Sequence, residues 1–205
     1  GESCALVTDA GTPAVSDPGE DLVRLCAENG VEVLSIPGCC AAVNALAVSG
    51  LPTGRFTFEG FLSTNKKERR EHLASLQNER RTMLFHEAPH KLRNTLDDLC
   101  AAFGSERRIA LCRELTKLHE ETMRCTLGEA ADYYRENAPR GEYVLVLAGA
   151  EPKAEAEVTL DEGVTQVLAL KAQGARMKDA VRQVSDATGL SRNELYNAAI
   201  SAETD

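Results

Sequence analysis

Hydrophobic and polar positions divide the chain into three parts with different patterns. Up to residue 53, two short apolar runs flank one amphipathic helix pattern, and a second helix pattern of small residues follows. Residues 54–150 alternate apolar, β-like runs with helix patterns, whereas residues 151–205 begin as a polar linker and continue with helix patterns only. Alternating strand and helix patterns are typical of α/β domains. The sequence therefore predicts an incomplete α/β domain over residues 1–53, a second α/β domain over 54–150, and a linker with a small C-terminal helical module over 151–205.

The first part predicts a strand, a helix and a second strand. The apolar runs are Ala5–Val7 and Val31–Ile36, and the helix pattern between them starts at Glu20. Such a unit has a right-handed crossover and places both strand ends at one edge of the sheet, so the turns at Asp9 and Gly38 should lie side by side. Two strands are too few for an independent sheet. We therefore expect the chain to be a piece of a longer protein that has further strands upstream.

The loop Thr8–Gly19 is the strongest candidate for ligand binding in this part. Its glycines and prolines let backbone amides approach a ligand closely, and it carries the short polar side chains of Asp9, Thr12 and Asp17. Ligands of parallel sheets bind beyond the carboxyl ends of the strands. An ordinary connection, in which Asp17 caps the following helix, explains the same residues equally well.

The second part follows a break at Gly50–Gly54, where glycine and proline make a domain boundary the expected interpretation. The predicted strands are Phe56–Phe61, Thr82–Phe85, Arg108–Cys112, Thr122–Thr126 and Tyr143–Ala148. The predicted helices are Asn65–Asn78, His90–Phe103 and Leu127–Asn137. Together these elements complete one α/β domain.

The third part predicts three helices, over Leu160–Gln173, Met177–Thr188 and Ser191–Ile200. Gly189 lies at a turn between the last two, which gives them the pattern of a helix-turn-helix. Such a unit either enters a DNA groove or simply packs its apolar residues into a small core. Arg192 is the sole basic residue of the last predicted helix, which weakens the DNA interpretation.

Composition and charge narrow the classes of protein. No apolar run approaches the roughly 18 residues of a membrane span, and no signal peptide opens the chain. The seven cysteines form an odd set without a Cys-x-x-Cys pair, which is typical of a reduced, cytoplasmic protein. The formal net charge of -9 argues against indiscriminate nucleic-acid binding, yet residues 66–93 carry eight Lys or Arg against four Asp or Glu. That excess suits a phosphate backbone, and it is equally typical of a solvated helix face.

The segment His86–His90 matches the His-Glu-x-x-His signature of zinc proteases. That signature needs a helix, so that the two histidines share one face. Pro89 costs roughly 3 kcal/mol inside a helix and disfavours the helical conformation at Ala88. We therefore interpret Glu87–Pro89 as a turn between a strand and a helix, and predict no metal site.

Seven short motifs stand out for their residue combinations. They are Thr8–Gly19, Pro37–Gly38, Ser49–Thr53, Phe58–Leu62, Glu87–His90, Arg113–Glu121 and Gly128–Glu129. Together they resemble the signatures of the ribosomal small-subunit methyltransferase I family, within the tetrapyrrole methylase-like superfamily. The likeness covers about residues 4–149. It departs from the family where the usual Pro-Gly-Pro-Ser-Ala turn has Cys39 and Cys40, where His86 replaces a tyrosine, and where Ala88 replaces a serine.

The resemblance implies two α/β domains of the tetrapyrrole methylase type that bind S-adenosylmethionine between them. It also implies methyl transfer to the ribose 2'-hydroxyl of a cytidine in the decoding centre of 16S ribosomal RNA. The implied cofactor-binding residues are Asp9, Ala10, Thr12, Cys39, Cys40, Ala41, Glu87, Ala88, Gly141 and Glu142. The candidates for assisting the hydroxyl are Glu87 and Glu114. The candidates for RNA binding are Lys66, Lys67, Arg69, Arg70, Arg113 and Lys117.

The implied partners are 16S ribosomal RNA within the small ribosomal subunit and a second copy of the chain in a homodimer, with no membrane. Family members start with a further strand and a glycine-rich loop, so we expect this chain alone to bind the cofactor weakly or not at all. Two alternatives stay open. One is a methylase of small tetrapyrroles on the same fold, which the basic helix disfavours. The other is a non-enzymatic nucleic-acid-binding protein that uses the C-terminal helices, which the acidic total disfavours.

Overall fold

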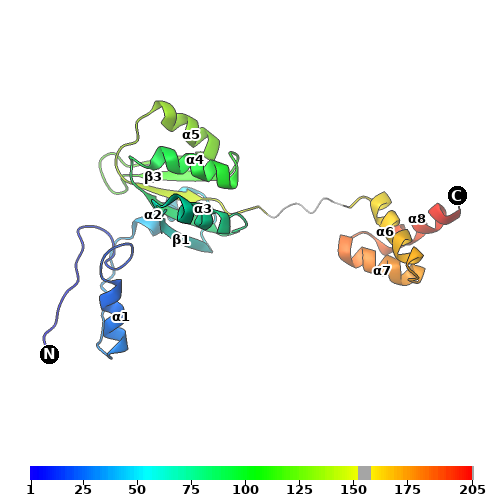
Figure 1. Ribbon diagram of the computed structural model, residues 1–205, viewed down its shortest axis with the longest axis horizontal. Helices are drawn as coiled ribbons and strands as arrows, with labels where there is room; N and C mark the ends of the chain where they lie inside the picture. The colour runs from blue at the N-terminus through cyan, green and yellow to red at the C-terminus, as the bar shows by residue number, and fades with distance from the viewer. Residues whose placement is uncertain (152–157, 205) are drawn as a thin grey trace. The chain divides into compact units, whose positions relative to one another are not determined.

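The computed structural model describes residues 1–151 and 158–204 (Figure 1). The chain divides into two compact units, Gly1–Glu151 and the helical unit that follows. Most of the predicted linker falls on residues 152–157, outside the described residues. The domain boundary expected between residues 53 and 54 stays a prediction.

A mixed five-stranded sheet organises the first unit, with strand order β1-β2-β5-β3-β4. The strands are β1 (Phe56–Phe61), β2 (Thr82–Glu87), β3 (Arg108–Arg113), β4 (Glu121–Thr126) and β5 (Tyr143–Leu147). β1 and β2 are parallel, whereas β5 runs antiparallel to both β2 and β3. β5 is buried along its whole length, which explains why it reads as a continuous apolar run rather than an alternating one.

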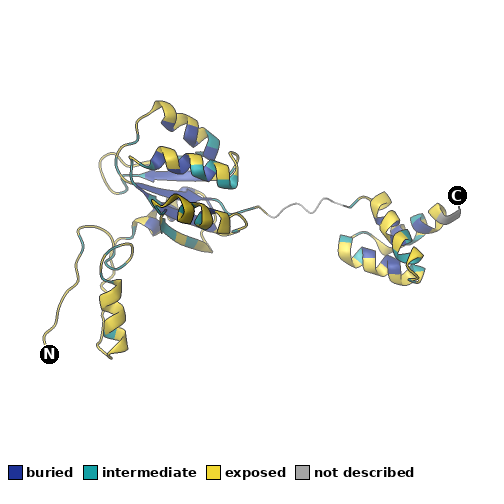
Figure 2. Cartoon of the chain, viewed as in Figure 1, coloured by how far each residue is buried: buried dark blue, intermediate teal, exposed yellow. Residues whose placement is uncertain are grey.

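Helices cover both faces of this sheet, and Figure 2 shows the buried strands between their exposed outer surfaces. Successive strand residues point to opposite faces, so β2 contributes Met83 and Phe85 to one core and Leu84 to the other. The first core lies under α3 (Lys66–Ser75), α4 (Leu92–Phe103) and α5 (Leu127–Glu136). The second lies under α2 (Ala41–Ser49). All of these helices were predicted, with ends shifted by a few residues.

The strand directions bring several chain segments to one edge of the sheet, which we call the site edge. Glu87 at the end of β2 pairs with Tyr143 at the start of β5, and Arg113 at the end of β3 pairs with the same Tyr143. Phe61 at the end of β1 pairs with His86. The site edge therefore collects the loops that follow β1, β2 and β3 and the loop that precedes β5.

The two strands predicted in the first part do not form. α1 (Glu20–Glu28) is present as predicted, but no strand is assigned within residues 1–40, and Val7, Leu34 and Ile36 are 81%, 76% and 85% exposed. A strand needs a neighbour that pairs with its backbone N–H and C=O groups. Within residues 1–151 and 158–204, neither segment has one. The prediction of a strand-helix-strand unit is therefore wrong for the described chain.

The second unit consists of α6 (Leu160–Ala172), α7 (Met177–Thr188) and α8 (Arg192–Thr204), as predicted except that α8 ends later. Gly189 ends α7 in the left-handed conformation, with φ of 75°. Arg192 forms an ion pair with Asp186 at 2.7 Å. The three helices bury a small apolar core of their own, made by Val164, Val167, Ala180, Val181, Val184, Leu195 and Ala199.

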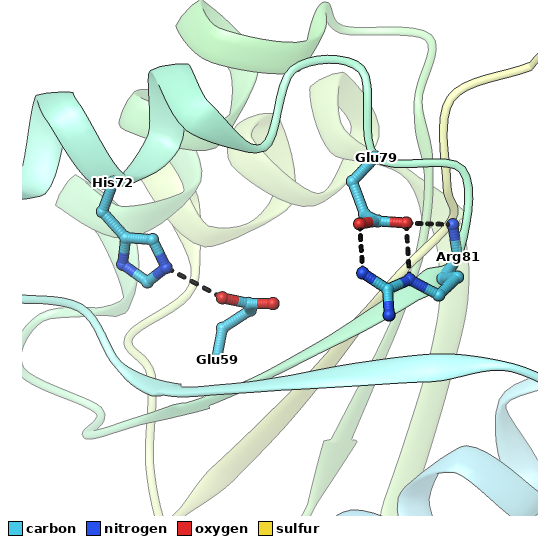
Figure 3. Close-up of polar contacts among 4 residues, drawn as sticks. All are labelled: Glu59, His72, Glu79 and Arg81. Atoms are coloured by element: carbon cyan, nitrogen blue, oxygen red, sulfur yellow. Dashed lines mark hydrogen bonds and ion pairs between the residues drawn. The ribbon is translucent and has the colours of Figure 1, made fainter.

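Figure 3 shows two pairs of polar side chains near the first two strands. His72 on α3 has its Nε2 atom 2.8 Å from Oε2 of Glu59 on β1. Arg81, just before β2, donates to both carboxylate oxygens of Glu79, at 2.9 and 2.6 Å. The backbone N–H of Arg81 donates to the same carboxylate at 2.7 Å. The guanidinium and this N–H lower the pKa of Glu79 to about 2.

Replacing Glu79 with glutamine should lower the free energy of unfolding at neutral pH. Because the folded-state pKa is depressed, the carboxylate stabilises the fold above its ordinary pKa of 4.5 and loses that contribution as the pH falls toward about 2. Urea unfolding over this pH range should therefore show wild type and variant converging at the acid end. In an Arg81→Met background the same substitution should have a smaller pH-dependent effect, because the guanidinium is lost while the backbone N–H of residue 81 still donates to Glu79. A difference that stays constant across the range would contradict this account.

Replacing Gly149 with alanine should destabilise the first unit. A Cβ at this position would lie 2.0 Å from the backbone oxygen of Arg80 and 2.8 Å from that of Arg81, so backbone must move. We expect the free energy of unfolding to fall by about 1–3 kcal/mol, measured by denaturant titration. Gly54→Ala is the matched control, because a Cβ there has nothing within 4 Å. Equal unfolding midpoints for the two variants would refute the steric argument.

Candidate active site at one edge of the sheet

The turn after β3 contacts the segment before β5 through a compact set of hydrogen bonds. The backbone N–H of Glu114 donates to the carbonyl of Glu142 at 3.1 Å, and the backbone N–H of Glu142 donates to Oε1 of Glu114 at 3.0 Å. Lys117 donates to Oε1 of Glu114 at 3.1 Å and to Oε2 of Glu142 at 3.0 Å. The structure therefore joins three residues that the sequence assigned to three different roles.

These donors set the charge of Glu114. The backbone N–H of Glu142, followed by the ammonium of Lys117, lowers the pKa of Glu114 below its ordinary value. The two carboxylates in turn raise the pKa of Lys117, with Glu142 the larger contributor. Glu114 is consequently a carboxylate at neutral pH and a weak base. Its side chain lies at the site edge and is 20% exposed.

Gly141 allows the side chain of Glu114 to approach Glu142. Its φ is +76°, and a Cβ at this position would lie 2.5 Å from Cγ and 2.6 Å from Cδ of Glu114. A larger residue would be strained in this conformation and would push Glu114 away from Glu142. The glycine before β5 is therefore a requirement of the Glu114 position.

Glu87 has a different environment from Glu114. Glu87 is only 4% exposed, and each of its carboxylate oxygens accepts a hydrogen bond. The N–H of Ala88 donates to Oε1 at 2.9 Å, and the hydroxyl of Thr95 on α4 donates to Oε2. Glu87 is thus enclosed between β2 and α4, where it fixes the turn that follows β2.

His86 lies next in β2 and points to the other face of the sheet. Its ring stands edge-on to Phe58 and Phe61, with centroids 5.1 and 5.4 Å away. Burial lowers the pKa of His86, so the imidazole is neutral at physiological pH. Its Nε2 atom is buried and has no hydrogen-bond partner in the described chain. A buried polar atom without a partner is costly, which makes this position a candidate for ligand contact.

The first loop meets the turn before α2, as the sequence predicted, even though the strands behind them do not form. Thr12 donates through its hydroxyl to the carbonyl of Cys39 at 3.0 Å. Cys40 is the N-cap of α2 and makes no side-chain capping bond there. Ser16 lies against β1, with Oγ 3.8 Å from where a Cβ of Gly60 would sit. The described contacts thus bring Thr12 and Cys39 together, while Asp9 and Ala10 stay exposed.

The predicted RNA-binding cations fall into two groups. Lys66, Lys67 and Arg70 are exposed on α3, whereas the side chain of Arg69 is only 12% exposed. Arg69 donates to Asp98 at 2.5 Å and to the hydroxyl of Thr95 at 2.9 Å, both on α4. At the site edge, Arg113 pairs with Glu121 at 2.7 Å, and Lys117 is held by the two glutamates described above.

A groove of about 950 Å³ lies between α3 and α4. Lys66 and Arg70 line it from α3, and Lys91 lines it from the turn before α4. Lys91 was counted in the basic excess of residues 66–93 but not among the RNA-binding candidates, and Thr95 was not singled out from the sequence. The signal for Thr95 was its spacing, since it lies three residues after Leu92 on the buried stripe of α4.

The structure confirms the interpretation of the His86–His90 segment. His86 and Glu87 end β2, and α4 begins only at Leu92, so the two histidines do not share a helix face. Within residues 1–151 and 158–204, no cluster of three or more His, Cys, Asp or Glu is placed to hold a metal ion. None of the helices in that part of the chain has the length and apolar character that a membrane crossing requires.

Comparison with known proteins identifies close relatives. The Tetrapyrrole (Corrin/Porphyrin) Methylases profile matches residues 1–131, and the RsmI C-terminal HTH domain profile matches residues 158–203. A protein named Ribosomal RNA small subunit methyltransferase I from Synechocystis sp. is 45% identical over 100% of this chain and 74% of its own length. Its namesake from Halalkalibacterium halodurans is 43% identical over 96% of this chain and 69% of its own length.

Solved structures share the fold. The methyltransferase CobJ superimposes with a TM-score of 0.52 at 22% identity, over 68% of this chain and 62% of its own. Cobalt precorrin-4 methyltransferase superimposes with a TM-score of 0.51 at 17% identity, over 67% of this chain and 61% of its own. The chain therefore spans about three fifths of these two structures.

The family profile covers well over half of the chain, and the relatives match it along nearly its whole length. The helical tail has its own profile, which agrees with the predicted helix-turn-helix. The chain therefore belongs to the tetrapyrrole methylase family and, within it, to the ribosomal RNA small subunit methyltransferase I group.

Proposed function

We propose that this protein transfers a methyl group from S-adenosylmethionine to the ribose 2'-hydroxyl of a cytidine in the decoding centre of 16S ribosomal RNA. The observation that carries the proposal is the 45% identity over the whole chain to a relative named for small-subunit ribosomal RNA methylation. A match of the tail to the RsmI C-terminal HTH domain separates this proposal from a tetrapyrrole methylase. The cytoplasm, the assembled small subunit as substrate and a homodimer complete the proposal, and they rest on the family resemblance.

The residues at the site edge and in the first loop fit the proposed cofactor. S-adenosylmethionine supplies an electrophilic methyl group on a sulfonium centre and presents an adenine ring, hydroxyls and charged groups to the protein. The Nε2 atom of His86, which has no partner among the residues that the structure describes, offers a polar contact, and Phe58 and Phe61 beside it offer apolar surface. At Gly11 of the first loop, a Cβ would meet nothing within 4 Å, so the backbone is open to a ligand there.

The residues proposed to hold the cofactor come from four segments. They are Asp9, Ala10 and Thr12 in the first loop, Cys39, Cys40 and Ala41 before α2, Glu87 and Ala88 after β2, and Gly141 and Glu142 before β5. The Thr12 contact to Cys39 supports the joining of the first two segments. The pairing of Glu87 with Tyr143 supports the joining of the last two.

Between the two candidate acids, the contacts favour Glu114 as the group that faces the substrate. A ribose hydroxyl is a poor acid, and methyl transfer to it needs an aligned oxygen and an acceptor for its proton. Glu87 is enclosed and both of its oxygens already accept a bond. In Glu114 the hydrogen bonds from the N–H of Glu142 and from Lys117 both fall on Oε1. As a weak base held in place, Glu114 would orient the hydroxyl and accept its proton as the oxygen gains the methyl group, when that proton becomes strongly acidic.

The exposed cations of α3 are proposed to receive RNA phosphates. Lys66, Lys67 and Arg70 face solvent on one helix, and the groove between α3 and α4 adds Lys91. Arg113 and Lys117 extend this set to the site edge. Such contacts bind phosphate groups without reading sequence, so target choice depends on the position of the site edge as well.

Methyl transfer from labelled S-adenosylmethionine to small ribosomal subunits that lack this modification tests the proposed function. With the full-length protein, we expect label on one cytidine ribose of 16S ribosomal RNA, located by nuclease digestion and mass spectrometry. Label on a base, or transfer only to a tetrapyrrole, would overturn the proposal. Free 16S RNA beside the assembled subunit shows which of the two is the substrate.

Replacing Gly141 with alanine should lower kcat about 10–100-fold in the full-length protein, since a misplaced reactive group costs this much. The added methyl group displaces Glu114, which lies within 2.6 Å of it. Gly30→Ala is the matched control, because its φ is +66° and nothing lies within 4 Å of an added Cβ. Gly30→Ala should lose the stability that a positive φ costs but keep its rate, and only Gly141→Ala should lose rate. Equal rates in the two variants would contradict the role of this contact.

A further inference from the structure

A buried chain of polar contacts runs from α3 through α4 to the end of β2. Arg69 on α3 donates through one terminal nitrogen to the hydroxyl of Thr95 at 2.9 Å, and Thr95 donates to Oε2 of Glu87. Nε of Arg69 donates to Asp98 at 2.5 Å. Thr95 is 0% exposed and Glu87 is 4% exposed. The chain thus links a residue of the basic helix to a residue of the site edge without contact with solvent at its centre.

The chemical groups fix which partner donates in each of these hydrogen bonds. A guanidinium only donates hydrogen bonds and a carboxylate only accepts them. The Thr95 hydroxyl has one proton, so it accepts from Arg69 and donates to Glu87. A carboxylate taken out of water is costly unless it is paired. Thr95 and Arg69 together compensate the enclosed Glu87, with the hydroxyl as the bridge between opposite charges.

The other oxygen of Glu87 connects these hydrogen bonds to the turn after β2, at the site edge. Oε1 accepts the N–H of Ala88 at 2.9 Å, so the carboxylate holds the first peptide of the turn after β2. This turn contains two of the proposed cofactor-binding residues, Glu87 and Ala88. The position of the turn therefore depends on a carboxylate whose own position depends on Thr95.

We propose that Arg69 and Thr95 are positioning residues that hold the Glu87–Ala88 turn in place and thereby set the affinity for S-adenosylmethionine. This inference rests on the proposed function, because it takes the turn to be part of the cofactor site. Arg69 acts through Thr95 and Glu87 and does not contact RNA. Its side chain is only 12% exposed and is paired with Asp98, in contrast to its exposed neighbour Arg70.

The test compares three threonine variants of the full-length protein. Thr95→Val keeps the shape of the side chain but removes the hydroxyl, and Thr95→Ser keeps the hydroxyl. Thr82→Val is the matched control, because Thr82 is a buried threonine at the opposite end of β2 that donates to the carbonyl of Pro52 at 2.6 Å. Two quantities are measured for each: the Kd for S-adenosylmethionine by calorimetry, and the hydrogen exchange rate of the Ala88 amide without cofactor.

Thr95→Val should raise the Kd about tenfold, the scale of one lost hydrogen bond to a charged group. It should also accelerate exchange of the Ala88 amide, because Glu87 no longer holds it. Thr95→Ser should restore both quantities to within about twofold of wild type, which a purely apolar packing role would not explain. Thr82→Val should change neither, although it loses a comparable buried bond.

Two outcomes overturn the inference. One is a Thr95→Val variant whose Kd and Ala88 exchange match those of Thr82→Val. The other is faster Ala88 exchange with an unchanged Kd, because the turn would then not set cofactor affinity. If the predicted differences appear while the wild-type protein methylates no ribosomal RNA, the inference stands and the proposed substrate fails. Failure of the two ideas is thereby distinguished.

Discussion

The antiparallel placement of β5 between β2 and β3 is the constraint on which the site depends. Because β5 runs against both neighbours, its first residue, Tyr143, lies opposite the last residues of those strands, Glu87 and Arg113. Segments more than 25 residues apart in the chain therefore share one edge. Packing opposes a change of register, since a slip of one residue would move the large Tyr143, Leu145 and Leu147 into the core that now holds Val144 and Val146. The proposed joining of the Glu87–Ala88 turn with Gly141 and Glu142 follows from that register.

Much of the second part of the fold could be predicted because its central strands are buried and therefore consist mainly of apolar residues. β3 and β5 are nearly continuous apolar runs, and their predicted ends differ from the observed ones by a single residue. The first part behaved differently. Ala5–Val7 and Val31–Ile36 have the residues of strands, but a strand also requires a paired neighbour, and an isolated sequence pattern cannot supply one. The helix α1, whose hydrogen bonds are internal, formed where it was predicted.

The candidate site was harder to predict because the sequence gives the number of charged residues but not which of them pair with one another. Arg69 and Arg70 are equivalent in the sequence, yet the side chain of Arg69 is 12% exposed and paired with Asp98 on α4, whereas Arg70 is exposed. Glu87 and Glu114 were equally plausible acids, and only the contacts separate them. Thr95 carried no sign of chemistry beyond its place on an apolar stripe. The basic excess of α3 available to a polyanion is therefore smaller than its sequence indicates, which is consistent with a protein of net charge -9.

Backbone strain gives an independent reason to place function in the same two loops. Four non-glycine residues in the described chain have positive φ, namely Ala14, Ser16, Glu114 and Thr116. Each costs roughly 1–2 kcal/mol relative to an ordinary conformation. Such residues persist where surrounding contacts over-determine them, and they concentrate at functional sites. All four lie in the first loop or in the turn after β3. The N–H of Glu142 donates to Oε1 of Glu114 and lowers its pKa, and the same bond helps to hold the turn after β3 in this conformation.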